Sequence, residues 1–144
     1  MKIYLDNCCY NRPFDNQNAL VIQLETEAKL DVQERIKQGE FELCWSFVLD
    51  YENGANPFEE VRNRINEWKY IACADCDLND EIANKASMLM TLGLQQMDAS
   101  HLACAIYLDA DYFLTTDKRV LNKPISDIIV MNPIDFIRSE VDEK

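Results

Sequence analysis

Short apolar segments alternate with longer segments of helical periodicity along this chain, and this alternation constrains its fold most strongly. The candidate strands are Ile3–Leu5, Glu42–Ser46, Tyr112–Thr115 and Ile128–Met131. Helices are expected from about residue 17 to 38 and over 47–53, then along segments centred near residues 63, 86 and 104, and finally from Pro133 onward. Strands that alternate with helices favour a central parallel sheet flanked by helices on both faces, which is an α/β fold.

The length of 144 residues suits one domain spanning residues 1–144, and no linker or repeat divides the chain. No apolar run approaches the ~20 residues that span a bilayer, so no membrane association is expected. Asp6 interrupts the N-terminal segment where an export signal would be apolar. Six cysteines in a chain without such a signal indicate thiols in a reducing compartment, so we expect a cytoplasmic protein.

The formal net charge is −12, from 26 acidic and 14 basic residues. This balance excludes an overall basic surface that would attract nucleic acid by itself. It favours a basic partner or a bound divalent cation.

Cys73 and Cys76 form a CxxC pair, which occurs in zinc sites and in redox enzymes. A zinc site would need a second ligand pair, but Cys8 and Cys9 are adjacent and His101 is the sole histidine. The strand-to-helix context of a thioredoxin motif is also missing. We therefore expect a structural role for this pair.

Carboxylates follow the predicted strands at positions that would bring them together. Asp6 follows the first strand, Asp117 follows YFLTT, Asp98 begins a predicted helix, and Glu52 lies on the short helix after the second strand. In open α/β sheets, ligands bind outside the carboxyl ends of the strands. The sequence thus predicts an acidic site at this edge.

Each acid also has a simpler interpretation. Asp98 and Asp117 would serve as helix N-caps, and Glu52 as a solvated helix residue. Asp6 is harder to explain in this way, because no cation is near it in the sequence and an unpaired buried acid is costly.

Two carboxylates about 4 Å apart repel by roughly 4 kcal/mol at an effective dielectric constant of 20, so a cluster needs a cation. Oxygen ligands favour Mg²⁺ or Mn²⁺. With one histidine available for acid–base chemistry, metal-dependent phosphodiester hydrolysis fits better than metal-free RNA cleavage.

The segments MKIYLDNC, WSFVLDYE, QMDASHLACA and YFLTTDKRVL resemble the motifs of PIN-domain proteins. That family includes the toxin ribonucleases of VapBC-type toxin–antitoxin pairs, and the resemblance runs from Met1 to about Pro133. It implies a sheet of order 3-2-1-4-5 and Mg²⁺- or Mn²⁺-dependent endonucleolytic cleavage of RNA that leaves 5′-phosphate and 3′-hydroxyl ends.

The resemblance implies roles for particular residues. It places the catalytic acids at Asp6, Glu52, Asp98 and Asp117, and the metal ligands at Asp6, Asp98 and Asp117. Asp50 is a competitor for the role of Glu52. Substrate-binding or supporting roles are expected for Asn7, Arg12, Thr116, Lys118 and His101. Asn7 departs from the Ser or Thr of many relatives. Tyr10, Phe14 and Trp45 are candidates for base stacking, or for the core.

An RNA substrate, a small antitoxin-like protein that inserts a basic residue among the carboxylates, and a homodimer are the partners that the resemblance implies. The alternative is a non-catalytic module of the same fold whose acidic face binds a basic protein. A receiver domain or a haloacid-dehalogenase-type phosphohydrolase fits less well, because Asp6-Asn7-Cys8 lacks the paired acids of those sites.

Overall fold

Four short parallel strands form the centre of the molecule in the computed structural model, which describes residues 1–142. They are β1 (Lys2–Leu5), β2 (Glu42–Cys44), β3 (Tyr112–Leu114) and β4 (Ile129–Met131). The strand order is β2-β1-β3-β4, with β1 paired in parallel to both β2 and β3. The predicted α/β class and parallel sheet are confirmed.

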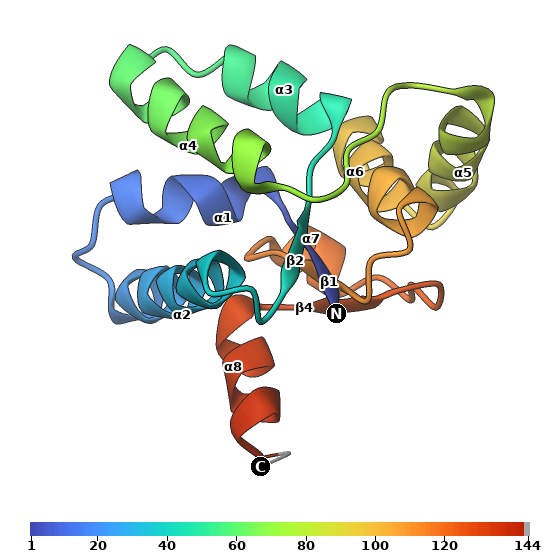
Figure 1. Cartoon of the computed structure of the whole chain (residues 1–144). Coiled ribbons are helices and arrows are strands. Elements are labelled where there is room, and N and C mark those ends of the chain that lie inside the picture. Colours follow the sequence, from blue (N-terminus) through green and yellow to red (C-terminus); the bar gives the residue numbers. More distant parts are fainter. Residues whose placement is uncertain (143–144) are drawn as a thin grey trace.

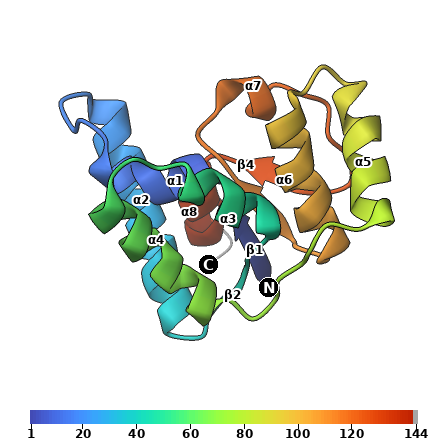
Figure 2. The same ribbon diagram turned by 90° about the horizontal axis from the view of Figure 1, so that it is seen from above.

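Helices cover both faces of this sheet. The segments are α1 (Asn7–Asn11), η1 (Arg12–Phe14, a 3-10 turn), α2 (Leu20–Lys37), α3 (Phe47–Gly54), α4 (Glu59–Ile71), α5 (Asp80–Met90), α6 (Gln96–Tyr107), α7 (Lys118–Leu121) and α8 (Pro133–Asp142). Helices α1, α2 and α4 lie on one side and α5 and α6 on the other (Figures 1 and 2). Within the described residues, no helix combines the length and hydropathy needed to cross a bilayer.

The predicted five-strand order differs from the structure at one edge of the sheet. Segment 73–76 runs along the outer side of β2, and the Trp45 and Phe47 amides donate to the carbonyls of Ala74 and Cys76. Only one parallel bridge, between Cys44 and Ala74, forms there, so the outermost strand is reduced to a single pairing. Acidic residues are depleted in strands, and this segment contains Asp75 and is followed directly by Asp77. The CxxC pair thus contributes to the sheet edge.

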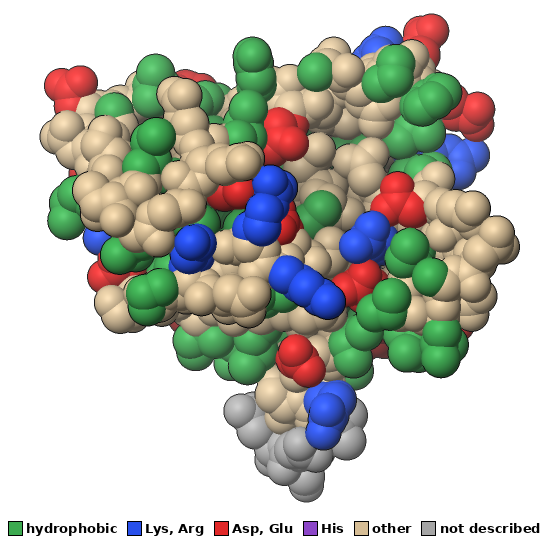
Figure 3. All heavy atoms as spheres, turned by 180° about the vertical axis from the view of Figure 1, so that it is seen from behind, with side chains coloured by type: hydrophobic (Ala, Val, Ile, Leu, Met, Phe, Trp, Pro, Cys, Tyr) green, Lys and Arg blue, Asp and Glu red, His purple; other side chains and the backbone are tan. Residues whose placement is uncertain are grey.

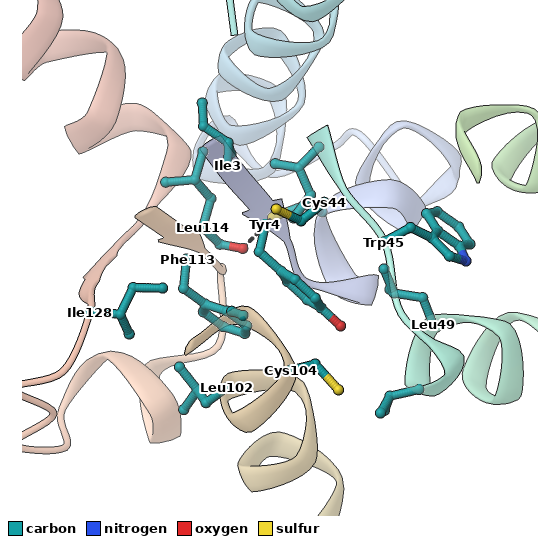
Figure 4. Packing of buried hydrophobic residues seen from close by; sticks show 14 of the residues in the cluster. Ile3, Tyr4, Cys44, Trp45, Leu49, Leu102, Cys104, Phe113, Leu114 and Ile128 are labelled. Carbon is teal, nitrogen blue, oxygen red and sulfur yellow. Dashed lines mark hydrogen bonds between the residues drawn. The ribbon is translucent and has the colours of Figure 1, made fainter. Parts of the chain in front are cut away.

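The core forms around β1, whose residues Ile3, Tyr4 and Leu5 are fully buried (Figure 4). The Tyr4 ring stacks on Phe113 of β3 with a centroid distance of 5.3 Å. Trp45 is also fully buried, so its assignment to the core is confirmed. Because β1 is central, the side chains that follow it are held on the most rigid part of the sheet.

One lysine is buried in an unusual way. Lys29 of α2 is only 4% exposed, and no carboxylate of the described chain forms an ion pair with it. Its Nζ atom lies 5.9 Å from the centroid of the Tyr10 ring. Burial lowers the pKa of Lys29 to about 8. The nearby acid Glu25 is engaged elsewhere, because Arg12 and Asn132 both donate to it.

We expect Lys29→Met to raise the free energy of unfolding at pH 7 by up to roughly 3 kcal/mol, since the folded state disfavours the charged amine. The folded-state pKa lies below the unfolded value, so the unfolded wild type binds more protons between about pH 8 and 10.5. The difference in free energy of unfolding between the variant and the wild type should therefore shrink as pH rises through this window. Urea unfolding at several pH values measures the difference, and a constant gap would contradict it.

Candidate active site

Asp6 follows the last residue of β1 and begins α1. Its carboxylate accepts from the Asn7 amide at 2.8 Å, so it caps the helix, and from Thr115 Oγ1 at 2.8 Å. The Asp6 amide donates to the Leu114 carbonyl, which ties it to the end of β3. Asp6 is therefore fixed at the carboxyl edge of two neighbouring strands, although it is almost fully buried.

Glu52 reaches the same place from α3. This helix begins at Ser46, whose hydroxyl caps it directly after β2. One Glu52 oxygen is hydrogen-bonded to His101 Nε2, and the other accepts from Asn7 Nδ2 at 3.2 Å. His101 Nε2 also lies 3.7 Å from Asp6 Oδ1. The structure thus brings Asp6, Glu52, Asn7 and His101 together from three separate parts of the chain.

A buried hydrogen-bond chain supports this cluster from below. His101 Nδ1 and the Tyr4 hydroxyl are 2.7 Å apart, and the same hydroxyl is 2.5 Å from Ser46 Oγ. Tyr4, Ser46 and His101 are all fully buried. The chain, which we call the Ser46–Tyr4–His101 relay, fixes the imidazole ring from behind and turns Nε2 toward the carboxylates.

Two opposing effects determine the charge of His101. Burial disfavours the imidazolium, but the hydrogen bond to Glu52 and the charges of Asp6, Glu52 and Asp98 outweigh it, and the pKa of His101 is raised. The acids around His101 thus favour its imidazolium form, which, when present, compensates part of the negative charge in the cluster.

Asp98 lies in the first turn of α6, whose N-cap is Gln95, so Asp98 is not the cap that the simpler interpretation assumed. Within the described residues no hydrogen bond or ion pair reaches its carboxylate. Burial raises the pKa of Asp98, and the charges of Asp6 and Asp117 raise it further. Asp98 thus has unused ligand capacity and interacts electrostatically with both of these acids.

Asp117 has a different environment. It caps α7, and Arg119 holds it through Nη2 at 2.9 Å and Nε at 3.2 Å. These contacts lower the pKa of Asp117. The simpler interpretation, a helix cap with a basic neighbour, therefore describes Asp117 in this structure, and its carboxylate is the most compensated of the four.

The remaining predicted residues lie around this cluster. Arg12 is paired with Asp15 and Glu25, and its Nη2 donates to Thr116 Oγ1 at 3.1 Å. Lys118 is exposed in the first turn of α7.

Asp50 and Glu52 differ in their contacts. Asp50 accepts from Trp45 Nε1 and Lys69, whereas Glu52 turns toward Asp6 and Asn7.

Sequence reasoning missed the residues that orient the acids. Thr115, rather than Thr116, is the buried hydroxyl that donates to Asp6, and it also accepts from the Asp117 amide at 3.1 Å. Tyr4 and Ser46 were assigned only to strands. The alternation of side chains along β3 was the available signal for Thr115, whereas the relay links positions far apart in sequence and left no local pattern.

The donor set can be tested for its fit to a divalent cation. One oxygen each of Asp6 and Glu52 and one nitrogen of His101 lie within 4.8 Å of one another. Asp98 is not one of these three residues. Its carboxylate has no hydrogen-bond partner in residues 1–142, and its pKa is raised by burial and by the charges of Asp6 and Asp117. Carboxylates crowded in this way suit a hard cation such as Mg²⁺ or Mn²⁺. The residues present therefore fit such an ion.

A groove leads away from the cluster. It has a volume of about 550 Å³, and its lining includes Asn7, Glu52, Phe14 and Phe58. Phe14 and Phe58 are exposed, whereas Tyr10 belongs to the core. The acidic site is thus continuous with an open channel that has aromatic side chains on its walls.

Comparisons with solved structures identify the fold. The chain is similar to a chain of VapBC-1 from nontypeable Haemophilus influenzae, with a TM-score of 0.61, 17% identity and coverage of 92% of this chain and 98% of that one. It is also similar to a chain of VapBC2 from Rickettsia felis, solved with a DNA fragment from their promoter, with a TM-score of 0.57, 15% identity and the same coverage. The expected PIN-like fold is confirmed. No family model and no curated protein sequence matches.

We expect Tyr4→Phe to lower the free energy of unfolding by about 2 kcal/mol, because it leaves His101 Nδ1 and Ser46 Oγ buried without their shared partner. Tyr10→Phe is the matched control, since the Tyr10 hydroxyl is buried without a hydrogen-bond partner among the described residues. Its removal should cost much less. Chemical denaturation of both variants tests the relay, and equal losses would contradict it.

Proposed function

We propose that this protein is a metal-dependent endoribonuclease that hydrolyses RNA phosphodiester bonds at the Asp6–Glu52–Asp98 cluster. The observation that carries the proposal is the convergence of Asp6 from the end of β1 and Glu52 from α3 beside His101 at the carboxyl edge of the sheet. Asp98 of α6 interacts electrostatically with Asp6. The similarity to VapBC chains supports it, because it gives the fold on which the sequence motifs place these acids.

Asp6 and Asp98 would hold Mg²⁺ or Mn²⁺ directly, with Glu52 beside them and Asp117 completing the acidic rim. When bound, such an ion supplies a water of lowered pKa and a positive charge for the leaving oxygen. Both Mg²⁺ and Mn²⁺ accept water and phosphate oxygens besides carboxylates, which leaves room for substrate.

The protein's own groups have positioning roles in this proposal. Thr115 and the Asn7 amide fix the rotamer of Asp6, and His101, held by the relay, fixes Glu52. Lys118, exposed beside the site, would bind a phosphate of the RNA backbone. Arg12 would instead act through Thr116, because its guanidinium is already occupied by two carboxylates.

The surface charge shapes how substrate would be bound. On the face seen in Figure 3, Lys and Arg side chains in the middle lie next to Asp and Glu side chains. Such mixed charge on a chain of net charge −12 provides little long-range attraction for RNA. Substrate capture would depend on the local metal site and groove.

A toxin role in a toxin–antitoxin pair follows as part of the proposal. Both structural neighbours are VapBC complexes. A small partner protein that places a basic side chain among Asp6, Glu52 and Asp98 would occupy the cation position and block the site. A homodimer is part of the same expectation.

The second candidate function is a non-catalytic module with the same fold. Two observations favour it: His101 already compensates Asp6 and Glu52, and Arg119 already compensates Asp117. An acidic face compensated by the chain itself would bind a basic protein without an ion.

Purified protein should cleave single-stranded RNA in Mn²⁺ or Mg²⁺ and lose this activity in EDTA. Asp6→Asn and Asp98→Asn should each lower the cleavage rate by roughly two orders of magnitude, because a bound cation contributes several kcal/mol. Gel analysis of a labelled RNA measures the rate. Asp31→Asn, an exposed change on α2, is the control and should cleave normally.

Cleavage that persists in EDTA would overturn the metal mechanism. Wild-type activity in both Asp6→Asn and Asp98→Asn would contradict the assignment of cleavage to this site.

Calorimetry separates the two candidate functions. Titration with Mn²⁺ should give saturable binding to the wild type and at least about tenfold weaker binding to Asp98→Asn, since that carboxylate has no other partner within the described chain. Absence of Mn²⁺ binding would favour the non-catalytic module.

A further inference from the structure

Four buried side-chain polar atoms in the described part of the chain have no hydrogen-bond partner. Two of them, the Tyr10 hydroxyl and Gln33 Nε2, belong to residues that line a single pocket of about 600 Å³. Lys29 lines it too. The pocket is lined by residues of α1, η1, α2 and α4 and contains none of the four acids of the candidate site, although Phe14 lines both this pocket and the groove beside Glu52. We call it the Lys29 pocket.

The three polar groups lie close together. Lys29 and Gln33 are one turn apart on α2, so they share a helix face. Lys29 Nζ lies 5.9 Å from the centroid of the Tyr10 ring. Lys29 is 4% exposed, Gln33 3% and Tyr10 1%. An ammonium, an amide NH₂ and a hydroxyl are therefore buried behind the lining of the pocket, and each of them can donate a hydrogen bond.

The charge of the pocket differs from that of the whole chain. Its lining carries the cations Lys29 and Arg64 against one acid, Glu67, in a protein of net charge −12. Arg64 is largely exposed and pairs with Glu60. Lys29 is thus the one buried charge of the pocket, and a single negative charge would neutralise it.

The rest of the lining is apolar. Leu30, Ile65 and Trp68 form the walls around the polar groups. A concave site of several hundred Å³ with apolar walls and a few converging polar groups is typical of small-molecule binding sites. An unpaired lysine in such a place also lowers stability, since burial disfavours its charged form.

We propose that the Lys29 pocket binds an organic monocarboxylate with an aliphatic or aromatic body. The carboxylate would accept from Lys29, Gln33 and Tyr10, and the body would pack against Leu30, Ile65 and Trp68. One negative charge matches the single buried ammonium, whereas a phosphate dianion would bring excess charge into a buried site. This binding site is independent of the proposed nuclease function.

Titration calorimetry of the full chain with hexanoate and 4-phenylbutyrate tests the proposal. Both should bind with one-to-one stoichiometry, and the corresponding alcohols, hexanol and 4-phenylbutanol, should bind at least about tenfold more weakly because they lack the charge. Absence of detectable carboxylate binding at millimolar concentrations, or equal binding of the alcohols, overturns it.

Variants locate the site. Lys29→Met keeps the length and apolar stem of the side chain and should weaken carboxylate binding by at least about tenfold, and Gln33→Leu and Tyr10→Phe should each weaken it several-fold. Lys85→Met on α5, which removes an equal charge on the far side of the sheet (Figure 2), is the control and should bind normally. Unchanged binding by Lys29→Met overturns the assignment. RNA cleavage by the variants reports separately on the acidic site.

Discussion

The candidate site depends on a buried hydrogen-bond chain that joins three elements of the fold, β1, α3 and α6. Tyr4 projects from the central strand and meets Ser46 at the start of α3 and His101 on α6. His101 then holds Glu52 of α3 on its other nitrogen. Any other arrangement of these elements would leave buried polar groups without partners, which is costly. The relay therefore fixes the elements in one arrangement. The acids converge because their supports are linked.

Charge compensation within the cluster is unequal, and this inequality distinguishes the acids. Arg119 pairs with Asp117, and His101 lies between Asp6 and Glu52. Asp98 receives no such partner from the described chain, and its pKa is raised by burial and by its acidic neighbours. Asp98, which has no direct hydrogen bond or ion pair within the described chain, is thus the acid best able to bind an added cation, whether a metal ion or a basic group of a partner.

The sequence predicted the parts of this molecule that are encoded locally. The strand that ends at Asp6 and the helix that carries Asp98 have clear periodicity, and each was found within a few residues of its position. The five-strand order that the resemblance implied was wrong at one edge, where segment 73–76 forms a single bridge to β2. The pairing of Arg12 with Glu25, and the use of Thr115 in place of Thr116, depend on side-chain directions fixed only by tertiary packing.

The two polar clusters of the molecule differ in how far the chain itself provides hydrogen-bond partners for their buried groups. At the acidic site the Asp6 carboxylate is hydrogen-bonded by the chain, Asn7 Oδ1 is the buried atom without a partner among the described residues, and Glu52 faces the groove. Around Lys29 the opposite holds, since the buried groups offer donors and the described chain provides no acceptor. A buried polar group is stable only when it is hydrogen-bonded. An acceptor supplied from outside would therefore stabilise the Lys29 pocket, just as an added cation would stabilise the acidic site.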